Sequence, residues 1–231
     1  SENYPEHVPK MKKFLVIFRG INTEYYDPNN INKKERTKFF AKLNIESGKK
    51  IILMPGRLTE WKGQELLIES LNILKTNFGY KNFVAIILGS DQGRDTYKKK
   101  LVRLVEQHRL NNDVIFLEHA NSMPVAYSIA NVVVSASIEP EAFGRVSVEA
   151  QSMKRPIIAS DIGGSKETII DNRTGLLFKS EDPKSLSEKI DNIFRSDDTT
   201  LNAMGNSGRK NVEQKFNVEK MCFSTYSEYK K

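Results

Sequence analysis

The chain has 231 residues, a hydrophobic fraction of 39% and a formal net charge of +7, which fits one large domain or two small ones with a buried core. Its apolar runs, such as residues 83–88, are far shorter than the ~20 residues that a membrane helix needs, and we expect no signal peptide at its start. One cysteine, Cys222, and three histidines argue against a disulfide scaffold and a zinc module.

The basic balance of the chain suggests a polyanionic partner. Nucleic acid, anionic lipid and a phosphorylated small molecule all fit a charge of +7. The alternative is a lysine-rich, solvated surface, and the wide spread of the basic residues favours this alternative for most of the excess charge.

Short apolar segments alternate with amphipathic segments along most of the chain. In chain order, the expected strands are 13–18, 51–55, 83–88, 113–117, 131–135, 156–159 and 176–178. The expected helices are 32–43, 63–77, 95–109, 144–153, 183–195, 199–214 and 218–229. Continuously apolar strands between helices are typical of a buried parallel sheet. The pattern predicts an α/β fold: a Rossmann-like, doubly wound parallel sheet with helices on both faces.

Glycines and charged residues follow the ends of the predicted strands. Ligands of open parallel sheets bind beyond the carboxyl ends of the strands, so this edge is the predicted cleft. Arg57 and Lys62 lie between the strand at 51–55 and the next helix, where together with the helix N-terminus they suit a diphosphate. The alternative is a solvated loop, although the helix dipole makes a lysine unfavourable at this position.

Two glutamates, Glu141 and Glu149, flank the expected start of a helix near Gly144. The backbone N–H groups of residues 143–146 would then face the cleft and bind phosphate oxygens, while Glu141 would accept hydrogen bonds from hydroxyl groups. A ligand with phosphates and many hydroxyls is a nucleotide sugar. An alternative stays equally open, in which Glu141 is a favourable charge at a helix start and Arg145 pairs with Glu149.

Other residues of this edge give weaker signals. The glycine fingerprints of dinucleotide-binding folds and of P-loops are missing. We expect the glycines at 163–164 to serve close packing and His119 to be a surface or partly buried histidine. Trp61 is expected to cover its loop or to pack locally, and Cys222 to lie in the core.

Four motifs fall in order on the predicted strand ends. They are Gly56-Arg57 with Lys62-Gly63, then Gly89, the segment 140–150 with its two glutamates, and the segment 156–167 with its paired glycines. Together they resemble the C-terminal domain of the group 1 (family 4) glycosyltransferases over about residues 8–230. The resemblance implies the GT-B fold, in which two Rossmann-like domains face each other across a cleft, and a retaining transferase. The run 140–167 is most similar to bacterial members that build lipopolysaccharide or other surface glycans.

The resemblance also implies a role for each motif residue. Arg57 and Lys62, beside Gly56, would hold the donor diphosphate, and with Glu141, which would face the donor sugar, they form the implied catalytic set. Glu149 would bind the ribose hydroxyls. The start of the helix would contribute further donor-binding residues: Ala142, Phe143, Gly144, Arg145 and Val146. The strand end near the base would consist of Leu117, Glu118 and His119.

The partners implied by the resemblance are a nucleotide-diphospho-sugar, which is a substrate, and a glycan or lipid-linked acceptor. No cofactor and no metal is expected, because fixed cations and the helix dipole would balance the charge of the diphosphate. Nucleic acid is disfavoured, because carboxylates in the cleft repel a phosphate backbone. The implied location is the cytoplasm or the inner face of the cytoplasmic membrane.

A full enzyme of this family is much longer, and its N-terminal domain binds the acceptor. We therefore expect residues 1–12 to be a linker or the end of that domain, 13–197 to be the nucleotide-sugar-binding domain, and 198–231 to be a helical extension. The last helix would pack on the missing domain, which would leave an apolar patch on this chain. The alternative functions are a non-catalytic nucleotide-sugar-binding module and an epimerase or phosphorylase of the GT-B fold.

Overall fold

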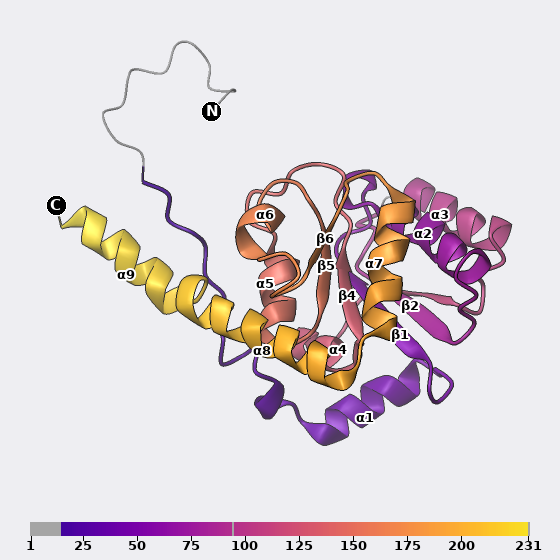
Figure 1. Ribbon diagram of the computed structural model, residues 1–231, viewed down its shortest axis with the longest axis horizontal. Coiled ribbons are helices and arrows are strands. Elements are labelled where there is room, and N and C mark those ends of the chain that lie inside the picture. Colours follow the sequence, from indigo (N-terminus) through magenta and orange to yellow (C-terminus); the bar gives the residue numbers. More distant parts are fainter. Residues whose placement is uncertain (1–14, 94, 231) are drawn as a thin grey trace, which may run out of the picture.

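Six strands form a parallel sheet in the order β3-β2-β1-β4-β5-β6 (Figure 1). The computed structural model describes residues 15–93 and 95–230. Its strands are β1 (Lys50–Pro55), β2 (Phe83–Leu88), β3 (Val114–Leu117), β4 (Val132–Ser135), β5 (Ile157–Ser160) and β6 (Leu176–Phe178). The strand order reverses between β1 and β4, which is the place where open α/β sheets bind their ligands.

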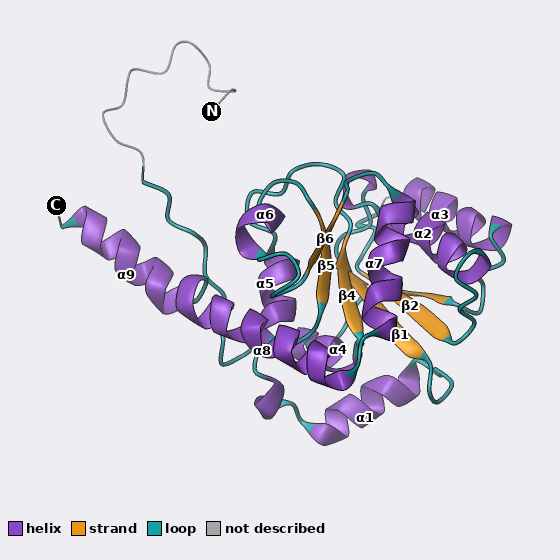
Figure 2. Ribbon diagram, viewed as in Figure 1, coloured by secondary structure: helices purple, strands orange, loops and turns teal. Residues whose placement is uncertain are grey.

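Helices cover both faces of the sheet (Figure 2). They are α1 (Lys33–Lys42), α2 (Gln64–Thr76), α3 (Asp95–Gln107), α4 (Met123–Ile129), α5 (Arg145–Ser152), α6 (Ser165–Thr168), α7 (Pro183–Arg195), α8 (Asp198–Lys215) and α9 (Val218–Tyr229), with short turns η1 (Pro28–Asn30) and η2 (Glu60–Lys62). Alternate residues of β1 enter two cores. Ile52 and Met54 pack in a cluster with α2, α3 and α7, whereas Ile51 and Leu53 pack with α4 and α5. The predicted Rossmann-like, doubly wound architecture is thus confirmed.

Most predicted elements agree with the structure to within two residues at each end. Helices α4 and α6 are the exceptions among the helices, because they were absent from the predicted set. Helix α6 has four residues, too few for a helical period to show. Helix α4 has seven residues, and from Pro124 to Ile129 all of them are buried, so it lacks the alternation of apolar and polar faces that marks a surface helix.

The predicted strand at 13–18 is wrong for residues 15–18. Residues 13 and 14 lie outside the described residues, and 15–20 have no regular structure. Leu15 and Val16 are 54% and 73% exposed. The first pairing of this segment is a single bridge from Ile21 to Asn217. In the described part of the chain no neighbouring strand offers this segment a ladder of hydrogen bonds, so its apolar residues alone do not make it a strand.

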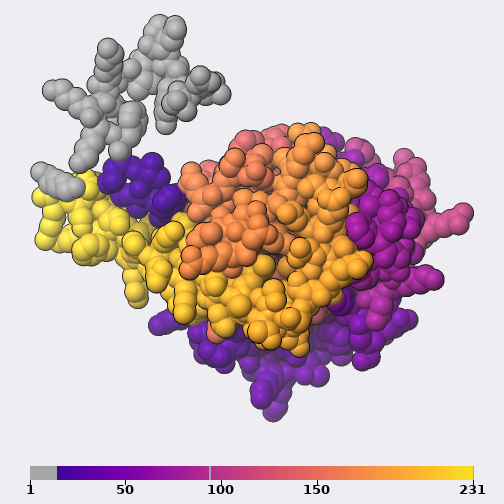
Figure 3. All heavy atoms as spheres, in the orientation of Figure 1, coloured from indigo at the N-terminus to yellow at the C-terminus, as the bar shows by residue number. Residues whose placement is uncertain are grey.

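The two C-terminal helices differ in their packing. Helix α8 lies so close to the end of α5 that a Cβ at Gly205 would meet the carbonyl oxygen of Lys154 at 2.5 Å. Helix α9 has no buried residue, and Phe223 is 71% exposed. Figures 1 and 3 show α9 leaving the body beside the segment that follows residue 15. The expected apolar patch is present, whereas Cys222, expected in the core, is exposed because α9 projects from the body.

The lengths and compositions of the helices also bear on membrane insertion. Among the residues that the structure describes, no helix combines the length and the apolarity that crossing a bilayer requires.

Candidate functional site

The loops after β1, β4 and β5 interlock at the carboxyl edge of the sheet. The Gly164 N–H donates a hydrogen bond to the carbonyl oxygen of Glu141 at 2.7 Å. A Cβ at Gly63 would lie 1.9 Å from the carbonyl oxygen of Ala136, and Gly163, with φ of 53°, lies against the backbone of Glu141. The close packing expected for 163–164 is confirmed. These contacts fix the backbone that carries the candidate site.

Glu141 is held by side chains from two of these loops. Lys62 Nζ lies 2.8 Å from Glu141 Oε1, and the Ser137 hydroxyl donates to the same oxygen. The lysine and glutamate side chains are only 13% and 16% exposed. In the described residues Oε2 accepts no hydrogen bond, so half of the carboxylate remains available to a ligand. The structure therefore brings two of the predicted site residues into direct contact.

The two predicted phosphate ligands have different surroundings. Lys62 Nζ lies over the Trp61 ring, 4.3 Å from its centre, so Trp61 packs locally as expected. Arg57 is exposed and lines a hollow of about 420 Å³ with Trp61 and Tyr97. Its guanidinium makes no hydrogen bond or ion pair with any described residue. An unpaired guanidinium beside a helix N-terminus is free to bind a doubly charged anion.

The first turn of α5 presents backbone N–H groups without a side-chain cap. Its N-cap is Gly144, with φ of 74°, whereas Asp182 and Asp197 accept backbone N–H groups at the starts of α7 and α8. Within the described part of the chain, the N–H groups of Arg145 and Val146 have no acceptor. Free N–H groups backed by the helix dipole suit an anion.

Glu149 lies one turn further along α5 and is engaged by two donors. The Tyr127 hydroxyl donates to Oε2 at 2.8 Å, and Arg145 Nη2 donates to Oε1 at 3.0 Å. The Arg145–Glu149 helix pair, one of the two interpretations left open by the sequence, therefore exists. It does not exclude a ligand, because a carboxylate offers about four lone-pair directions. Burial first, and then the charge of Glu149, raise the pKa of Tyr127 well above its ordinary value, so the phenol stays a neutral donor.

The strand end expected near a nucleotide base is more open. The carbonyl oxygen of Leu117 accepts a hydrogen bond from the neighbouring strand end, and Glu118 pairs with Lys98 of α3 at 2.9 Å. His119 is exposed, which confirms the expectation of a surface histidine. In the described residues none of the three bonds to the lysine–glutamate pair. Their nearness to a base stays a prediction.

Sequence reasoning missed one of the two side chains that hold each glutamate. Ser137 lies two residues beyond β4, so a closer inspection of the residues beyond each strand end could have found it. Tyr127 lies on the missed helix α4. Tyr26 packs edge-on against it, with ring centres 6.1 Å apart, and comes from a segment before α1 that carries no motif.

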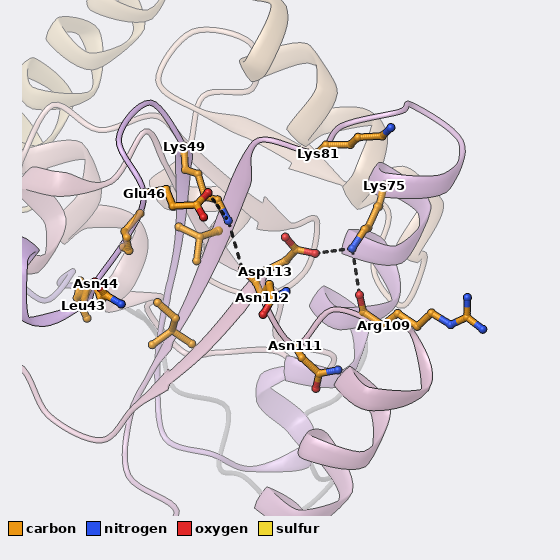
Figure 4. Close-up of a pocket in the computed structure, with 13 residues that line it drawn as sticks. Leu43, Asn44, Glu46, Lys49, Lys75, Lys81, Arg109, Asn111, Asn112 and Asp113 are labelled. Carbon is orange, nitrogen blue, oxygen red and sulfur yellow. Dashed lines mark hydrogen bonds and ion pairs between the residues drawn. The ribbon is translucent and has the colours of Figure 1, made fainter.

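A larger hollow lies at the opposite edge of the sheet. It measures about 860 Å³ and is lined mainly by residues that precede β1, β2 and β3. Lys75 Nζ lies 2.6 Å from Asp113, and Lys49 is likewise paired. Figure 4 shows the charged ends of Lys81 and Arg109 pointing away from it. Its cations are thus paired or turned outward, and none of the predicted site residues lines it.

Comparison with known proteins gives a consistent result. The family model described as glycosyl transferases group 1 matches residues 35–211, which contain all the candidate site residues. The capsular polysaccharide biosynthesis glycosyltransferase CapM of Staphylococcus aureus is 30% identical over 200 residues, or 87% of this chain and 50% of that protein.

Solved structures agree with the family match. A glycosyltransferase from Rickettsia africae is 33% identical, with a TM-score of 0.87 over 94% of this chain and 56% of that chain. Anabaena HepE, solved in complex with UDP-glucose, shares the fold at 24% identity, with a TM-score of 0.84 over 94% of this chain and 57% of that chain. The chain spans about half the length of the curated relatives it matches.

Proposed function

The chain belongs to the group 1 glycosyltransferases, and from that premise we propose that it is the donor-binding half of an enzyme that transfers a sugar from a nucleoside-diphosphate sugar. The observation that carries this proposal is the grouping at the carboxyl edge of the sheet. The Lys62–Glu141 pair lies before the uncapped start of α5, and Glu149 lies within that helix. Cations, free N–H groups and carboxylates on one edge complement a ligand that carries both phosphates and hydroxyls.

The donor diphosphate would bind the positive groups of this edge. Arg57 offers a planar guanidinium that forms no ion pair within the described part of the chain, although Glu60 and Glu139 line the same hollow. Lys62 offers a compact charge that it now shares with Glu141. The free N–H groups of Arg145 and Val146 would complete the site. As the bond to the sugar breaks, negative charge grows on the leaving diphosphate, and donors fixed in advance stabilise that charge most effectively. In this proposal the fixed cations neutralise the leaving group without a metal ion.

The carboxylates would bind the hydroxyl groups of the donor. The free Oε2 of Glu141 would accept a hydrogen bond from a sugar hydroxyl, while Lys62 turns to the phosphate. Glu149 would accept hydrogen bonds from the ribose. The strand end formed by Leu117, Glu118 and His119 would lie along the base.

Finer features of the reaction belong to the same proposal. The acceptor hydroxyl would attack from the face that the diphosphate leaves, so that the anomeric configuration is retained, and the product would be a bacterial surface glycan such as lipopolysaccharide. Support comes from the resemblance of the segment 140–167 to bacterial surface-glycan enzymes and from CapM, whose name places it in capsular polysaccharide biosynthesis. HepE was solved with UDP-glucose, which makes UDP the first nucleotide to test.

The acceptor would be held by a second, N-terminal domain. Helix α9 has no buried residue, and its side chains Phe223, Tyr226 and Tyr229 are all more than half exposed, as are Leu15 and Val16 beside it. An apolar surface of this kind marks a protein contact. A net charge of +7 would favour a cytoplasmic enzyme that visits an anionic membrane surface to reach a lipid-linked acceptor.

Calorimetry of the chain with UDP, GDP, ADP and CDP, and with the matching nucleosides, tests the proposal. One diphosphate should bind at least about tenfold more tightly than its nucleoside, since charge-assisted hydrogen bonds contribute about 1.5–3 kcal/mol each. Arg57→Ala should remove most of this preference. Arg173→Ala, an exposed arginine before β6, is the matched control and should leave it intact. Equal binding of nucleoside and diphosphate would contradict the donor site.

A further inference from the structure

Tyr127 is the more deeply buried of the two donors to Glu149. The tyrosine is 0% exposed, and its hydroxyl lies 2.8 Å from Glu149 Oε2. The side chain of Arg145, by contrast, is 68% exposed. Phenylalanine would fill the same apolar space, and burying a hydroxyl is unfavourable unless it is hydrogen-bonded. The hydroxyl is therefore explained by its bond to the carboxylate.

The two hydrogen bonds leave Glu149 with a defined set of free acceptor directions. A carboxylate has about two lone-pair directions on each oxygen. Tyr127 takes one on Oε2, and Arg145 takes one on Oε1, so each oxygen keeps at most one, with the Tyr26 phenol facing the same carboxylate. Two free directions on neighbouring oxygens match the two adjacent hydroxyls of a cis-diol. A deoxy sugar can use only one of them.

Tyr127 is itself packed against Tyr26. The Tyr26 ring meets it edge-on, and the carbonyl oxygen of Tyr26 accepts hydrogen bonds from Ser152 Oγ at 2.8 Å and Arg209 Nη1 at 2.6 Å. Burial first, and then the charge of Glu149 and a hydrogen-bonding interaction with it, raise the pKa of Tyr26 as well, so the Tyr26 phenol also faces this carboxylate as a neutral group. A packed ring with an anchored neighbour can hold the carboxylate in one orientation.

We propose that Tyr127 is a positioning residue, which turns the Glu149 carboxylate so that both of its free acceptor directions meet the cis-diol of a ribose and the site selects ribonucleotides over 2′-deoxyribonucleotides. The inference rests on the proposed function, because it takes Glu149 to face the ribose. Without the phenol the carboxylate can rotate toward Arg145, and it then presents one well-placed acceptor instead of two.

The test compares ribose and deoxyribose nucleotides by calorimetry. The probes are UDP, GDP, ADP and CDP, each with its 2′-deoxy counterpart. The comparison is made for the base whose diphosphate binds most tightly. The wild-type chain should prefer the ribonucleotide. Tyr127→Phe should lower that preference about threefold to tenfold through weaker ribonucleotide binding, because a misplaced acceptor weakens one hydrogen bond to a charged group without removing it.

Tyr80→Phe is the matched control. Tyr80 is half-buried against the core on the other face of the sheet, and its hydroxyl likewise donates to a carboxylate, Asp191 Oδ1, at 2.9 Å. Its loss should leave the preference for ribose unchanged. Equal weakening of both nucleotides by Tyr127→Phe, or an unchanged ratio, would overturn the positioning role. A lower melting temperature does not obscure the outcome, because structural damage weakens both ligands alike.

Glu149→Gln separates this inference from the proposed function. Loss of the ribose preference in Glu149→Gln, with full retention in Tyr127→Phe, would refute the positioning role and leave the donor site standing. In the Glu149→Gln background, Tyr127→Phe should cause no further change in the ratio. A wild-type chain that binds none of the eight nucleotides would refute the donor site itself.

Discussion

Replacing Glu141 by glutamine should tighten the binding of a nucleoside diphosphate, although Glu141 lies within the proposed site. In the structure Lys62 is not a free cation, because its ammonium group lies 2.8 Å from Glu141 Oε1. A diphosphate must therefore compete with the carboxylate for the lysine. It must also approach the negative charge of the carboxylate itself. Glu141→Gln keeps the shape and the hydrogen-bonding oxygen and removes the charge.

The size of the effect depends on the geometry of the pair. At 2.8 Å and an effective dielectric constant of about 20, the gross attraction is about 6 kcal/mol. Most of it is offset by desolvation, since both side chains are largely buried, and a charge-assisted hydrogen bond contributes a net amount of about 1.5–3 kcal/mol. If glutamine retains about half of this interaction, diphosphate binding should gain about 0.75–1.5 kcal/mol, or roughly fourfold to twelvefold.

Calorimetry with UDP, or with whichever diphosphate binds best, measures this gain. Glu46→Gln removes the same charge at the opposite edge of the sheet, where the carboxylate pairs with Lys49 and is 80% exposed, and it controls for the change in net charge. Affinity should rise in Glu141→Gln and stay constant in the control. Unchanged or weaker binding by a variant with an unchanged melting temperature would refute the competition between Glu141 and the phosphates for Lys62.

Four further predictions concern the proposed phosphate ligands, the glycines, a helix cap and the proposed second domain. Arg57→Ala and Lys62→Ala should each weaken diphosphate binding by about 1.5–3 kcal/mol and leave nucleoside binding nearly unchanged; equal losses in calorimetry would mean that they support the fold instead. Gly163→Ala should lower the free energy of unfolding in urea, by about 1–2 kcal/mol for the left-handed backbone and about 1–3 kcal/mol for the close contact. Gly79→Ala, where φ is 75° and nothing lies within 4 Å, isolates the first contribution, and equal losses at both sites would contradict the interlocked loops. Hydrogen bonds from the backbone and side chain of Thr200 hold the pKa of Asp197 below its usual range. The stabilisation by Asp197 is therefore present above the unfolded pKa of about 3.9 and is lost as pH falls through the lower folded pKa. Asp197→Asn should make the melting temperature less dependent on pH between pH 5 and 2, and an unaltered pH profile would show that the cap does not stabilise the helix. In a single-turnover assay with labelled nucleotide sugar and glycolipid acceptors, the chain alone should transfer no sugar, because positioning of the acceptor by the proposed second domain would supply about 7–11 kcal/mol of the activation barrier. Robust transfer would mean that the acceptor binds to the chain itself.

The fold could be predicted from the sequence because its strands are continuously apolar. Residues 83–88 are predicted as a strand and form β2, since a short, continuously apolar run between two helices is typical of a buried parallel strand. The same criterion fails at 15–18, where the apolar side chains lie on an exposed surface and the segment belongs to no sheet. A single sequence does not distinguish these cases, because the difference lies in whether a pairing partner is present.

The sequence predicts those residues of the candidate site that lie just beyond the end of a strand. Lys62 and Glu141 are 79 residues apart and meet at 2.8 Å, as the rule for parallel sheets implies. The phenol that holds Glu149 could not be found in this way. Tyr127 comes from a short helix buried on all sides, so its place is set by tertiary packing and not by a local pattern.

A crystal structure of the chain with the best-binding nucleoside diphosphate would decide whether the carboxyl edge of the sheet is the donor site. We expect the diphosphate between Arg57, Lys62 and the first N–H groups of α5, with the ribose hydroxyls on Glu149. A diphosphate bound instead in the hollow at the opposite edge of the sheet, beside Lys75 (Figure 4), would contradict the proposed site.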